Sequence, residues 1–274
     1  MRNLTATLCL TIAMLLDCNV AISEEFKTIS TRKGVTISFV KNTPLKDIKS
    51  AAILFAGGKG KIGINVNNKT VRSNNFIVRT RELFANLGIL TITPDAPSDM
   101  KNLKNIRQRL DYRTDISFLI KEIRNETTKP IWLIGTSRGS NTVGYHAAGL
   151  KIQGVALIAT VTEGNNHTIF DTDFIKIRVP TLVVHHKYDP CRVSPSSGAE
   201  NVFEQLMHSS KKHLLLFEKG DIGNGRDCGS NSHHGLLGIE KKVVFAMTEW
   251  MFKAVGKKLG KPTHECVRKK YKGC

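Results

Sequence analysis

Short apolar runs alternate with amphipathic segments along most of this chain. Each apolar run is continuous and too short for a typical helix, a pattern typical of strands that are buried on both faces of a sheet. Such strands are expected at Ala51 to Phe55, Ile89 to Thr93, Pro130 to Ile134, Gly154 to Thr160, Val179 to His185 and His213 to Phe217. The sequence therefore predicts an α/β fold with a mostly parallel central sheet and helices on both of its faces.

Four helices are expected between or after these strands, over about 75–87, 106–124, 137–149 and 239–255. Ser73 is a candidate N-cap of the first helix, and Gly88 would end it. Before the first buried strand, Lys27 to Thr31 and Val35 to Val40 alternate with period two around Lys33-Gly34. This alternation predicts a β-hairpin at the N-terminal edge of the sheet.

Residues 135–139, Gly-Thr-Ser-Arg-Gly, lie between an expected buried strand and an expected helix. They fit the nucleophile elbow G-x-S-x-G, in which a sharp strand-to-helix turn presents the central serine above the sheet. The glycines have a physical reason, because the turn strains the backbone and neighbouring side chains would collide there. Ser137 is therefore the candidate catalytic serine.

A catalytic serine needs a base that takes its proton and an acid that holds the base. In doubly wound sheets these groups come from loops at the carboxyl ends of later strands. Asp189, in the loop after the strand that contains His185, is the candidate acid, with Glu163 as the runner-up. His234 follows the last expected strand and precedes a glycine, which makes it the candidate base, with His233 as the alternative.

An acyl transfer also needs hydrogen-bond donors for its oxyanion. One expected donor is the backbone N–H of Arg138, directly after the serine, and the other comes from the Gly57-Gly58-Lys59 loop, where Gly58 is the candidate. The neighbouring histidines His185 and His186 suggest a metal site. Adjacent residues on a strand point to opposite faces, however, so no metal and no other cofactor is expected.

The N-terminus has the three parts of a secretory signal peptide: Met1-Arg2, an apolar core from Leu4 to Leu16, and the small residues Ala21 and Ser23, after either of which cleavage could occur. The core is too short to span a bilayer. A lipid anchor on Cys18 is the weaker alternative. We therefore expect a signal peptide over 1–23, a catalytic domain over 24–256 and a basic tail over 257–274, in a periplasmic or secreted protein without a transmembrane segment.

Removal of the leader would leave four cysteines, an even number that suggests disulfides in an exported chain. Cys191 and Cys228 lie near the two candidate catalytic loops, whereas Cys266 and Cys274 share the C-terminal tail. Proximity therefore favours pairing 191 with 228 and 266 with 274. Free buried thiols are the alternative.

The formal charge of +18 is partly concentrated at the C-terminus, where residues 253–274 hold eight Lys or Arg and one Glu. An anionic envelope surface is the candidate partner of such a tail, and a solvated terminus is the alternative. No nucleic-acid partner is expected, because Tyr271 is the only aromatic residue of the tail.

Together these features resemble the α/β-hydrolase superfamily, from about Phe26 to about Val255. The chain is most similar to compact exported members of the dienelactone-hydrolase and esterase type. The motifs that carry the resemblance are Thr-Arg-x-Gly-Val at 31–35, Phe-Ala-Gly-Gly at 55–58, the elbow and His-His-Gly at 233–235. Leu236 departs from the family pattern, in which many members have Phe, and should alter packing rather than chemistry.

The resemblance implies Ser137 as nucleophile, Asp189 as acid and His234 as base, with a disulfide between the acid and base loops that Cys191 and Cys228 match. The expected function is cleavage of a small-molecule ester through an acyl-enzyme. Only about twenty residues join two of the later strands, too few for a large cap, so the pocket should be open and suit small or flexible esters. The alternatives are an amidase, peptidase or thioesterase of the same fold, or a catalytically idle binding protein.

Overall fold

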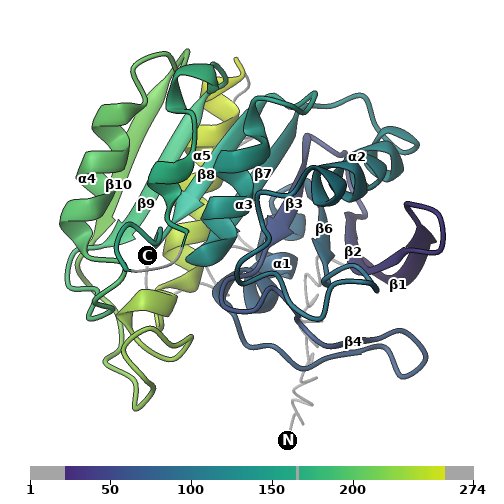
Figure 1. The fold of residues 1–274 in the computed structure, drawn as a ribbon, viewed down its shortest axis with the longest axis horizontal. Helices are drawn as coiled ribbons and strands as arrows, with labels where there is room; N and C mark the ends of the chain where they lie inside the picture. The colour runs from purple at the N-terminus through teal and green to yellow at the C-terminus, as the bar shows by residue number, and fades with distance from the viewer. Residues whose placement is uncertain (1–21, 165–166, 257–274) are drawn as a thin grey trace, which may run out of the picture.

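The computed structural model of the chain describes residues 22–164 and 167–256. Residues 1–21 of the expected leader, the expected basic tail and the Cys266–Cys274 pair lie outside the described residues. In the described part eight strands form one sheet in the order β1-β2-β6-β3-β7-β8-β9-β10, which spreads across Figure 1. Their bounds are β1 Ile22–Ser30, β2 Thr36–Pro44, β3 Ser50–Phe55, β6 Ile89–Pro94, β7 Ile131–Thr136, β8 Gly154–Ile158, β9 Thr181–His186 and β10 Lys212–Phe217.

The strand directions confirm the mostly parallel sheet with a hairpin at its N-terminal edge. β2 runs antiparallel to both of its neighbours, β1 and β6, while every other pair in this sheet is parallel. A second, two-stranded hairpin of β4 (Ile64–Asn65) and β5 (Thr70–Val71) was not predicted, because its strands are too short to carry a pattern.

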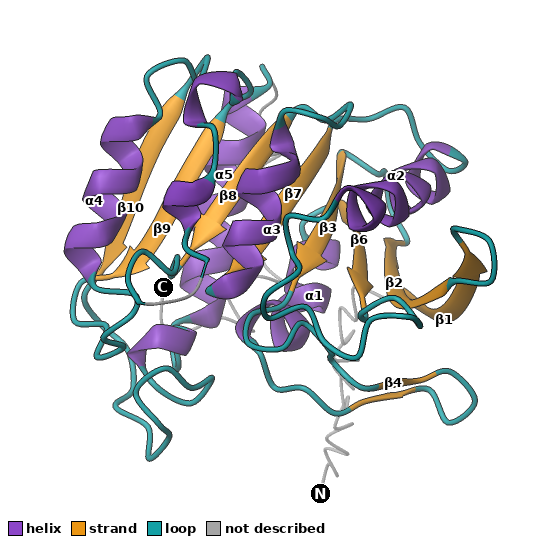
Figure 2. Cartoon of the chain, viewed as in Figure 1, coloured by secondary structure: helices purple, strands orange, loops and turns teal. Residues whose placement is uncertain are grey.

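Five α-helices cover the described part of the sheet, as Figure 2 shows: α1 Phe76–Asn86, α2 Leu110–Arg124, α3 Arg138–Ala147, α4 Ser196–Gln205 and α5 Glu240–Ala254. α2, α3 and α4 pack into one core and α1 and α5 into the other. Within β3, Ile53 and Phe55 join the first core, whereas Ala52 and Leu54 join the second. Burial on both faces explains why the strands read as continuous apolar runs.

Two of the helix predictions differ from the structure, and one helix was not predicted. Asn75, not Ser73, is the N-cap of α1, since its side chain accepts a hydrogen bond from the N–H of Ile77, while the Ser73 hydroxyl accepts from the N–H of Asn75. α2 begins at Leu110 rather than near 106, because Arg107 turns inward. α4 was missed, since it buries little more than Ala199 and Val202.

The strand order reverses at β3. From β3 the chain passes through α1 to β6 on one side, and then through α2 to β7 on the other. In open parallel sheets, ligands bind outside the carboxyl ends of the strands at such a reversal. The loop after β3 and the turn after β7, which holds Ser137, therefore meet at the position where a binding site is expected.

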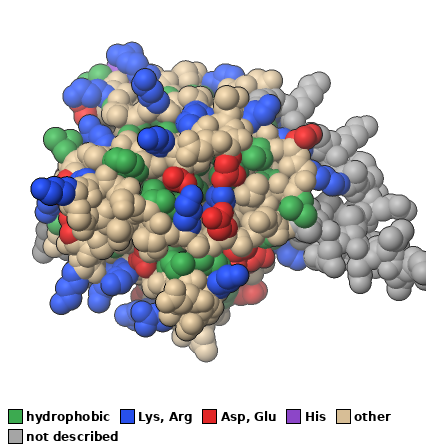
Figure 3. Space-filling model, turned by 90° about the vertical axis from the view of Figure 1, so that its right-hand side faces the viewer, with side chains coloured by type: hydrophobic (Ala, Val, Ile, Leu, Met, Phe, Trp, Pro, Cys, Tyr) green, Lys and Arg blue, Asp and Glu red, His purple; other side chains and the backbone are tan. Residues whose placement is uncertain are grey.

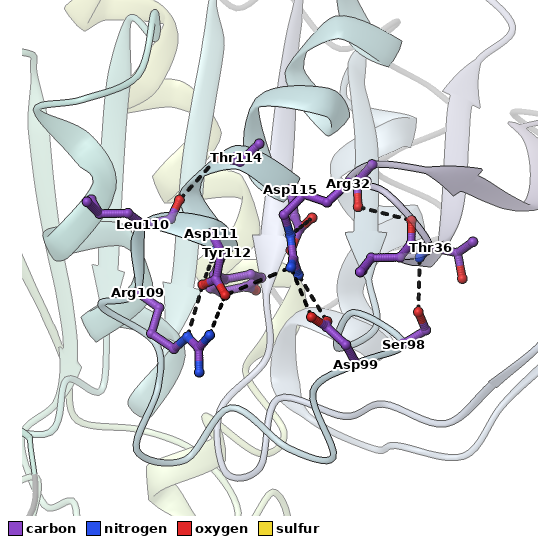
Figure 4. Close-up of polar contacts among 12 residues, drawn as sticks. Arg32, Thr36, Ser98, Asp99, Arg109, Leu110, Asp111, Tyr112, Thr114 and Asp115 are labelled. Carbon is purple, nitrogen blue, oxygen red and sulfur yellow. Dashed lines mark hydrogen bonds and ion pairs between the residues drawn. The ribbon is translucent and has the colours of Figure 1, made fainter.

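Arg32 fastens the N-terminal hairpin to the body of the fold, as Figure 4 shows. Its guanidinium donates two hydrogen bonds of 2.9 Å to Asp115 of α2 and two of 2.9 Å to Asp99, in the loop after β6. The Asp115 side chain is fully buried. These hydrogen bonds, first that of Asp115 and then that of Asp99, raise the pKa of Arg32 above its ordinary value. The Thr-Arg-x-Gly-Val motif thus has a structural purpose in this chain.

We expect Arg32→Met to lower the free energy of unfolding by about 3–5 kcal/mol, because it leaves the carboxylate of Asp115 buried without its cationic partner. Urea denaturation followed by circular dichroism measures the change. The neighbouring, exposed Lys33 is the control, and Lys33→Met should change the free energy by less than about 0.5 kcal/mol. Equal losses for the two variants would contradict the assigned role of Arg32.

The surface charge of the described part is dispersed on the face drawn in Figure 3, where Lys and Arg side chains are spread out and acidic side chains lie among them. Within residues 22–164 and 167–256, no helix has the length and apolar character needed to cross a membrane. On this face, then, the basic residues do not merge into one patch.

Candidate active site

Ser137 occupies a strained turn between β7 and α3. Its φ of 55° and ψ of −126° are rare for a residue with a side chain. A Cβ added to Gly135 would lie 2.3 Å from the carbonyl oxygen of Gly139, and a Cβ on Gly139 would lie 2.0 Å from that of Phe55. Close backbone packing therefore requires glycine at both positions and holds the serine in its strained conformation.

Asp189 and His234 meet at the carboxyl edge of the sheet. Asp189 lies in the loop after β9, and His234 lies in a short 3₁₀ turn, His233–Gly235, that follows β10. The Nδ1–H of His234 donates to Oδ2 of Asp189 over 2.8 Å, and the N–H of Cys191 donates to Oδ1 over 2.9 Å. His234 Nε2 is buried and has no hydrogen-bond partner among the described residues. This nitrogen is therefore free to accept a hydrogen bond.

The electrostatics of Asp189 favour its ionised form. Its side chain is fully buried, and burial alone would raise its pKa, but the hydrogen bonds from His185 and His234 outweigh this effect. The pKa of Asp189 is therefore lower than its ordinary value. A carboxylate that stays charged can hold a neighbouring imidazole in one tautomer and stabilise the imidazolium once it forms.

His185 is a second histidine on the same carboxylate, and the sequence had suggested it only as a metal ligand. Its Nε2 lies 3.2 Å from Oδ2 of Asp189 and 3.0 Å from the carbonyl oxygen of Ser194, so one N–H is shared between two acceptors. The ring is fully buried. Its place at the end of β9, four residues before Asp189, was the available signal.

The two alternative site residues lie elsewhere. His233 stacks on His186 with ring centroids 4.0 Å apart, and its Nδ1 lies 3.2 Å from the carbonyl oxygen of Tyr188. The pKa of His186 is lowered, mainly by burial and to a smaller extent by the nearby His233. Glu163 is exposed and makes no hydrogen bond to a histidine in the described part of the chain. Asp189 therefore contacts His234 and not the alternative base His233, and the alternative acid Glu163 contacts neither histidine.

The loop that carries His234 is fastened at several points. A disulfide between Cys191 and Cys228 joins it to the loop of Asp189, as predicted. Arg79 of α1 donates to the carbonyl oxygen of Gly235 over 2.6 Å and to Glu240 of α5 over 2.9 Å. Directly after the 3₁₀ turn, Leu236 is fully buried with a φ of 55°. These contacts fix the backbone on both sides of His234.

The glycine loop after β3 lies against the elbow. A Cβ added to Gly57 would lie 2.9 Å from the Cβ of Ser137, so the two backbones are in close contact there. Gly58 has a φ of 57°, which favours glycine. Neither the N–H of Gly58 nor that of Arg138 donates a hydrogen bond to another described residue. Two backbone donors are therefore unoccupied beside the serine.

Residues 22–164 and 167–256 contain no group of three or more His, Cys, Asp or Glu side chains that is arranged to hold a metal ion. The neighbouring pairs His185-His186 and His233-His234 are divided between the Asp189 carboxylate and the stacked ring pair. The four histidines therefore do not come together as ligands of one metal ion.

Comparison with known proteins gives matches at the level of structure. No protein-family model and no curated protein matches the sequence. The chain is similar to Est1E from Butyrivibrio proteoclasticus, with 16% identity, a TM-score of 0.58, and 85% of this chain and 100% of that one covered. It is similar to a dienelactone hydrolase from Anabaena variabilis, with 15% identity, a TM-score of 0.59, and 85% and 98% covered.

A third similar structure is XC6422 from Xanthomonas campestris, described as an α/β serine hydrolase without lid. It shares 16% identity and a TM-score of 0.57 with this chain, over 82% of this chain and 94% of the other. At such low identities the similarity shows the fold alone, and that fold agrees with the strand order and the parallel sheet described above. The chain therefore has the α/β-hydrolase fold.

Proposed function

We propose that this chain is a serine hydrolase that cleaves carboxylic esters of small or flexible substrates. The observation that carries the proposal is the buried, unpartnered Nε2 of His234, whose ring is held by Asp189, at the sheet edge where the elbow presents Ser137. An acceptor nitrogen that a carboxylate orients, at the sheet edge that also carries a strained serine, fits the arrangement that activates a hydroxyl nucleophile.

In the proposed mechanism the Ser137 hydroxyl attacks the ester carbonyl carbon while His234 Nε2 takes its proton. Asp189 accepts the Nδ1–H hydrogen bond, which keeps the lone pair on Nε2. The N–H groups of Gly58 and Arg138 donate to the oxyanion. His234 then returns its proton to the leaving alcohol, and an acyl-enzyme remains on Ser137. Water, activated by His234, hydrolyses this acyl-enzyme and frees the serine.

The connection between β8 and β9 supports an open pocket. Residues 159–180 form this connection, and within its described part there are two single-turn 3₁₀ helices, Ile169–Asp171 and Phe174–Lys176, and no α-helix. A segment of this size is too small to build a large cap over the site. One of the similar structures is also described as being without a lid. An open site suits small or flexible esters better than long acyl chains, which need a deep apolar pocket.

Export belongs to the same proposal. The Cys191–Cys228 disulfide, which joins the two loops of the site, is typical of oxidising compartments. Cleavage of the leader after Ser23 would remove Ile22 and Ser23 from β1, whereas cleavage after Ala21 would remove none of the described residues of this strand. We therefore favour cleavage after Ala21 and a periplasmic or secreted location. The basic tail over 257–274 stays a candidate contact with an anionic envelope surface.

Steady-state hydrolysis of nitrophenyl esters of increasing chain length, beside the matching nitroanilides and thioesters, tests this function. We expect the highest kcat/KM on short-chain esters, because an open site gives a long acyl chain little further surface to bury. A maximum on long chains would contradict the open pocket. Faster cleavage of anilides or thioesters would favour those alternatives. No turnover together with no labelling by a fluorophosphonate would favour a binding protein.

A further inference from the structure

Arg107 is a cation buried behind the loop after β3, which we call the oxyanion loop (residues 56–60). Only 2% of its surface is exposed. Among the described residues it forms no ion pair with a carboxylate; its guanidinium instead donates to the hydroxyl of Thr142 over 2.8 Å and to the carbonyl oxygens of Ala56 and Gly58 over 3.2 and 3.1 Å. Its Nε–H has no acceptor in the same part of the chain.

A buried charge of this kind is costly unless it is well paired. Burial lowers the pKa of Arg107 to about 10, so the side chain still carries its charge at neutral pH. Local rules are broken in this way mostly at functional sites. An apolar side chain of similar length would avoid the cost of burying a charge, but it would leave the carbonyl oxygens of Ala56 and Gly58 without this donor.

The position of Arg107 is itself fixed from behind. His146 of α3 donates from Nε2 to the carbonyl oxygen of Arg107 over 2.6 Å, and Arg113 donates to His146 Nδ1 over 3.2 Å. The ring therefore carries its proton on Nε2, and burial lowers its pKa to about 4, which keeps it neutral. This chain of contacts is why α2 starts only after Arg107, and it holds the guanidinium still.

The guanidinium determines how the oxyanion loop lies. It binds the carbonyl oxygens of residues 56 and 58, on either side of the peptide between Gly57 and Gly58. The carbonyl oxygen of that peptide accepts from the N–H of Gly60 over 3.0 Å. Because a trans peptide is planar, the N–H of Gly58 must point away from this hydrogen bond. It is the donor that finds no acceptor among the described residues.

We propose that Arg107 is the positioning residue of the oxyanion hole: it holds the carbonyl groups of Ala56 and Gly58 so that the N–H of Gly58 stays free for the substrate oxyanion. Its uncompensated positive charge, close behind the loop, adds to the stabilisation of the negative oxygen. This inference rests on the proposed function, since it assigns a role within the same reaction. Oxyanion-hole donors act in the transition state far more than in the ground state.

Two variants test the role. Arg107→Met removes both the charge and the guanidinium donors while it keeps a side chain of similar length. We expect kcat for a short-chain nitrophenyl ester to fall about 10²-fold, with KM changed less than about 3-fold. Arg107→Lys keeps a charge but cannot hold two carbonyl groups in a fixed fork, and we expect a fall of about 10-fold. All assays are run below the thermal transition of each variant, which circular dichroism measures. Arg107→Lys, as the milder change, is the comparison if Arg107→Met does not fold.

A matched control lies at the opposite edge of the sheet. Arg124 also donates to two backbone carbonyl groups, those of Thr127 and Lys129, but before the start of β7. Arg124→Met should leave kcat and KM within about 2-fold of the wild type. If the two arginines act only in folding, their variants would lose activity in step with folded protein, which would overturn the proposal.

A readout of the transition state separates positioning from general stability. A phenylboronic acid forms a tetrahedral adduct with an active serine, and we expect its Ki to rise with the fall in kcat/KM in the Arg107 variants. The Ki of the carboxylic acid product, which needs no oxyanion hole, should stay unchanged. An active wild type with unchanged kcat and boronic-acid Ki in Arg107→Lys would overturn the inference alone. A wild type inert to esters and to the boronic acid would overturn the proposed function itself.

Discussion

Replacement of Ser137 by Ala is expected to lower kcat for ester hydrolysis by about 10⁵- to 10⁶-fold, the range seen when a nucleophilic serine is removed. The hydroxyl makes no hydrogen bond to another described residue, so its loss should leave the melting temperature nearly unchanged. Labelling by a fluorophosphonate should disappear as well. Labelling that persists in Ser137→Ala would move the nucleophile to another residue.

The strained backbone of Ser137 provides a second, independent measurement. At a φ of 55° and ψ of −126° glycine is the residue with the least strain, so Ser137→Gly should raise the free energy of unfolding by about 1 kcal/mol while it abolishes activity. Ser137→Ala is the matched control, because alanine keeps the Cβ and therefore the strain. A higher free energy of unfolding in Ser137→Gly than in Ser137→Ala, with both variants inactive, would show that the backbone is strained at the nucleophile. Equal free energies of unfolding would contradict this.

The sheet could be predicted from sequence because its signal is strong and local. Each of the six expected buried strands lies within two residues of the observed bounds at both ends, whereas the two hairpin strands extend four or five residues further at one end than expected. Burial on both faces demands a continuous apolar run, and these runs are too short for a typical helix. The Cys191–Cys228 pairing was predictable for a similar reason, since two loops of one site had to be close.

Helix limits were less predictable because tertiary contacts override local preference. The periodicity of α2 continues back to Ile106, but His146 takes the carbonyl group of Arg107 and the guanidinium turns inward, so the helix starts at Leu110. α4 carries a narrow apolar stripe on a helix that covers the end of the sheet, and its sequence resembles a polar loop.

The supporting residues of the site were the least predictable. The glycine spacing and the order of Ser137, Asp189 and His234 pointed to one edge of the sheet, and the structure places Asp189 and His234 in contact there. For His185 the only signal was its place at the end of β9, four residues before Asp189. Arg107 acts on a loop far away in the sequence, and nothing in a local pattern distinguishes it from other charged residues. Such roles depend on three-dimensional packing.

Asp189→Asn is expected to lower kcat by about 10⁴-fold with little change in KM. The carboxylate accepts from three N–H groups, those of His185, His234 and Cys191, and an amide can accept only on its oxygen. The NH₂ group of the new asparagine must then face an N–H donor. Otherwise His234 must direct an Nδ1 lone pair toward this NH₂ group and carry its own proton on Nε2. In that tautomer Nε2 can no longer accept from the serine.

Steady-state kinetics and the rate of fluorophosphonate labelling measure this loss, and both should fall together because both need the serine to be deprotonated. Glu163→Gln is the matched control: it neutralises the other candidate acid, which lies exposed on the loop after β8, and should leave both rates unchanged. Circular dichroism confirms that each variant is folded at the assay temperature. If Glu163→Gln were the slow variant and Asp189→Asn the active one, the hydrogen bond to His234 would not be the one that orients the base, since tautomer control requires the acid that contacts Nδ1.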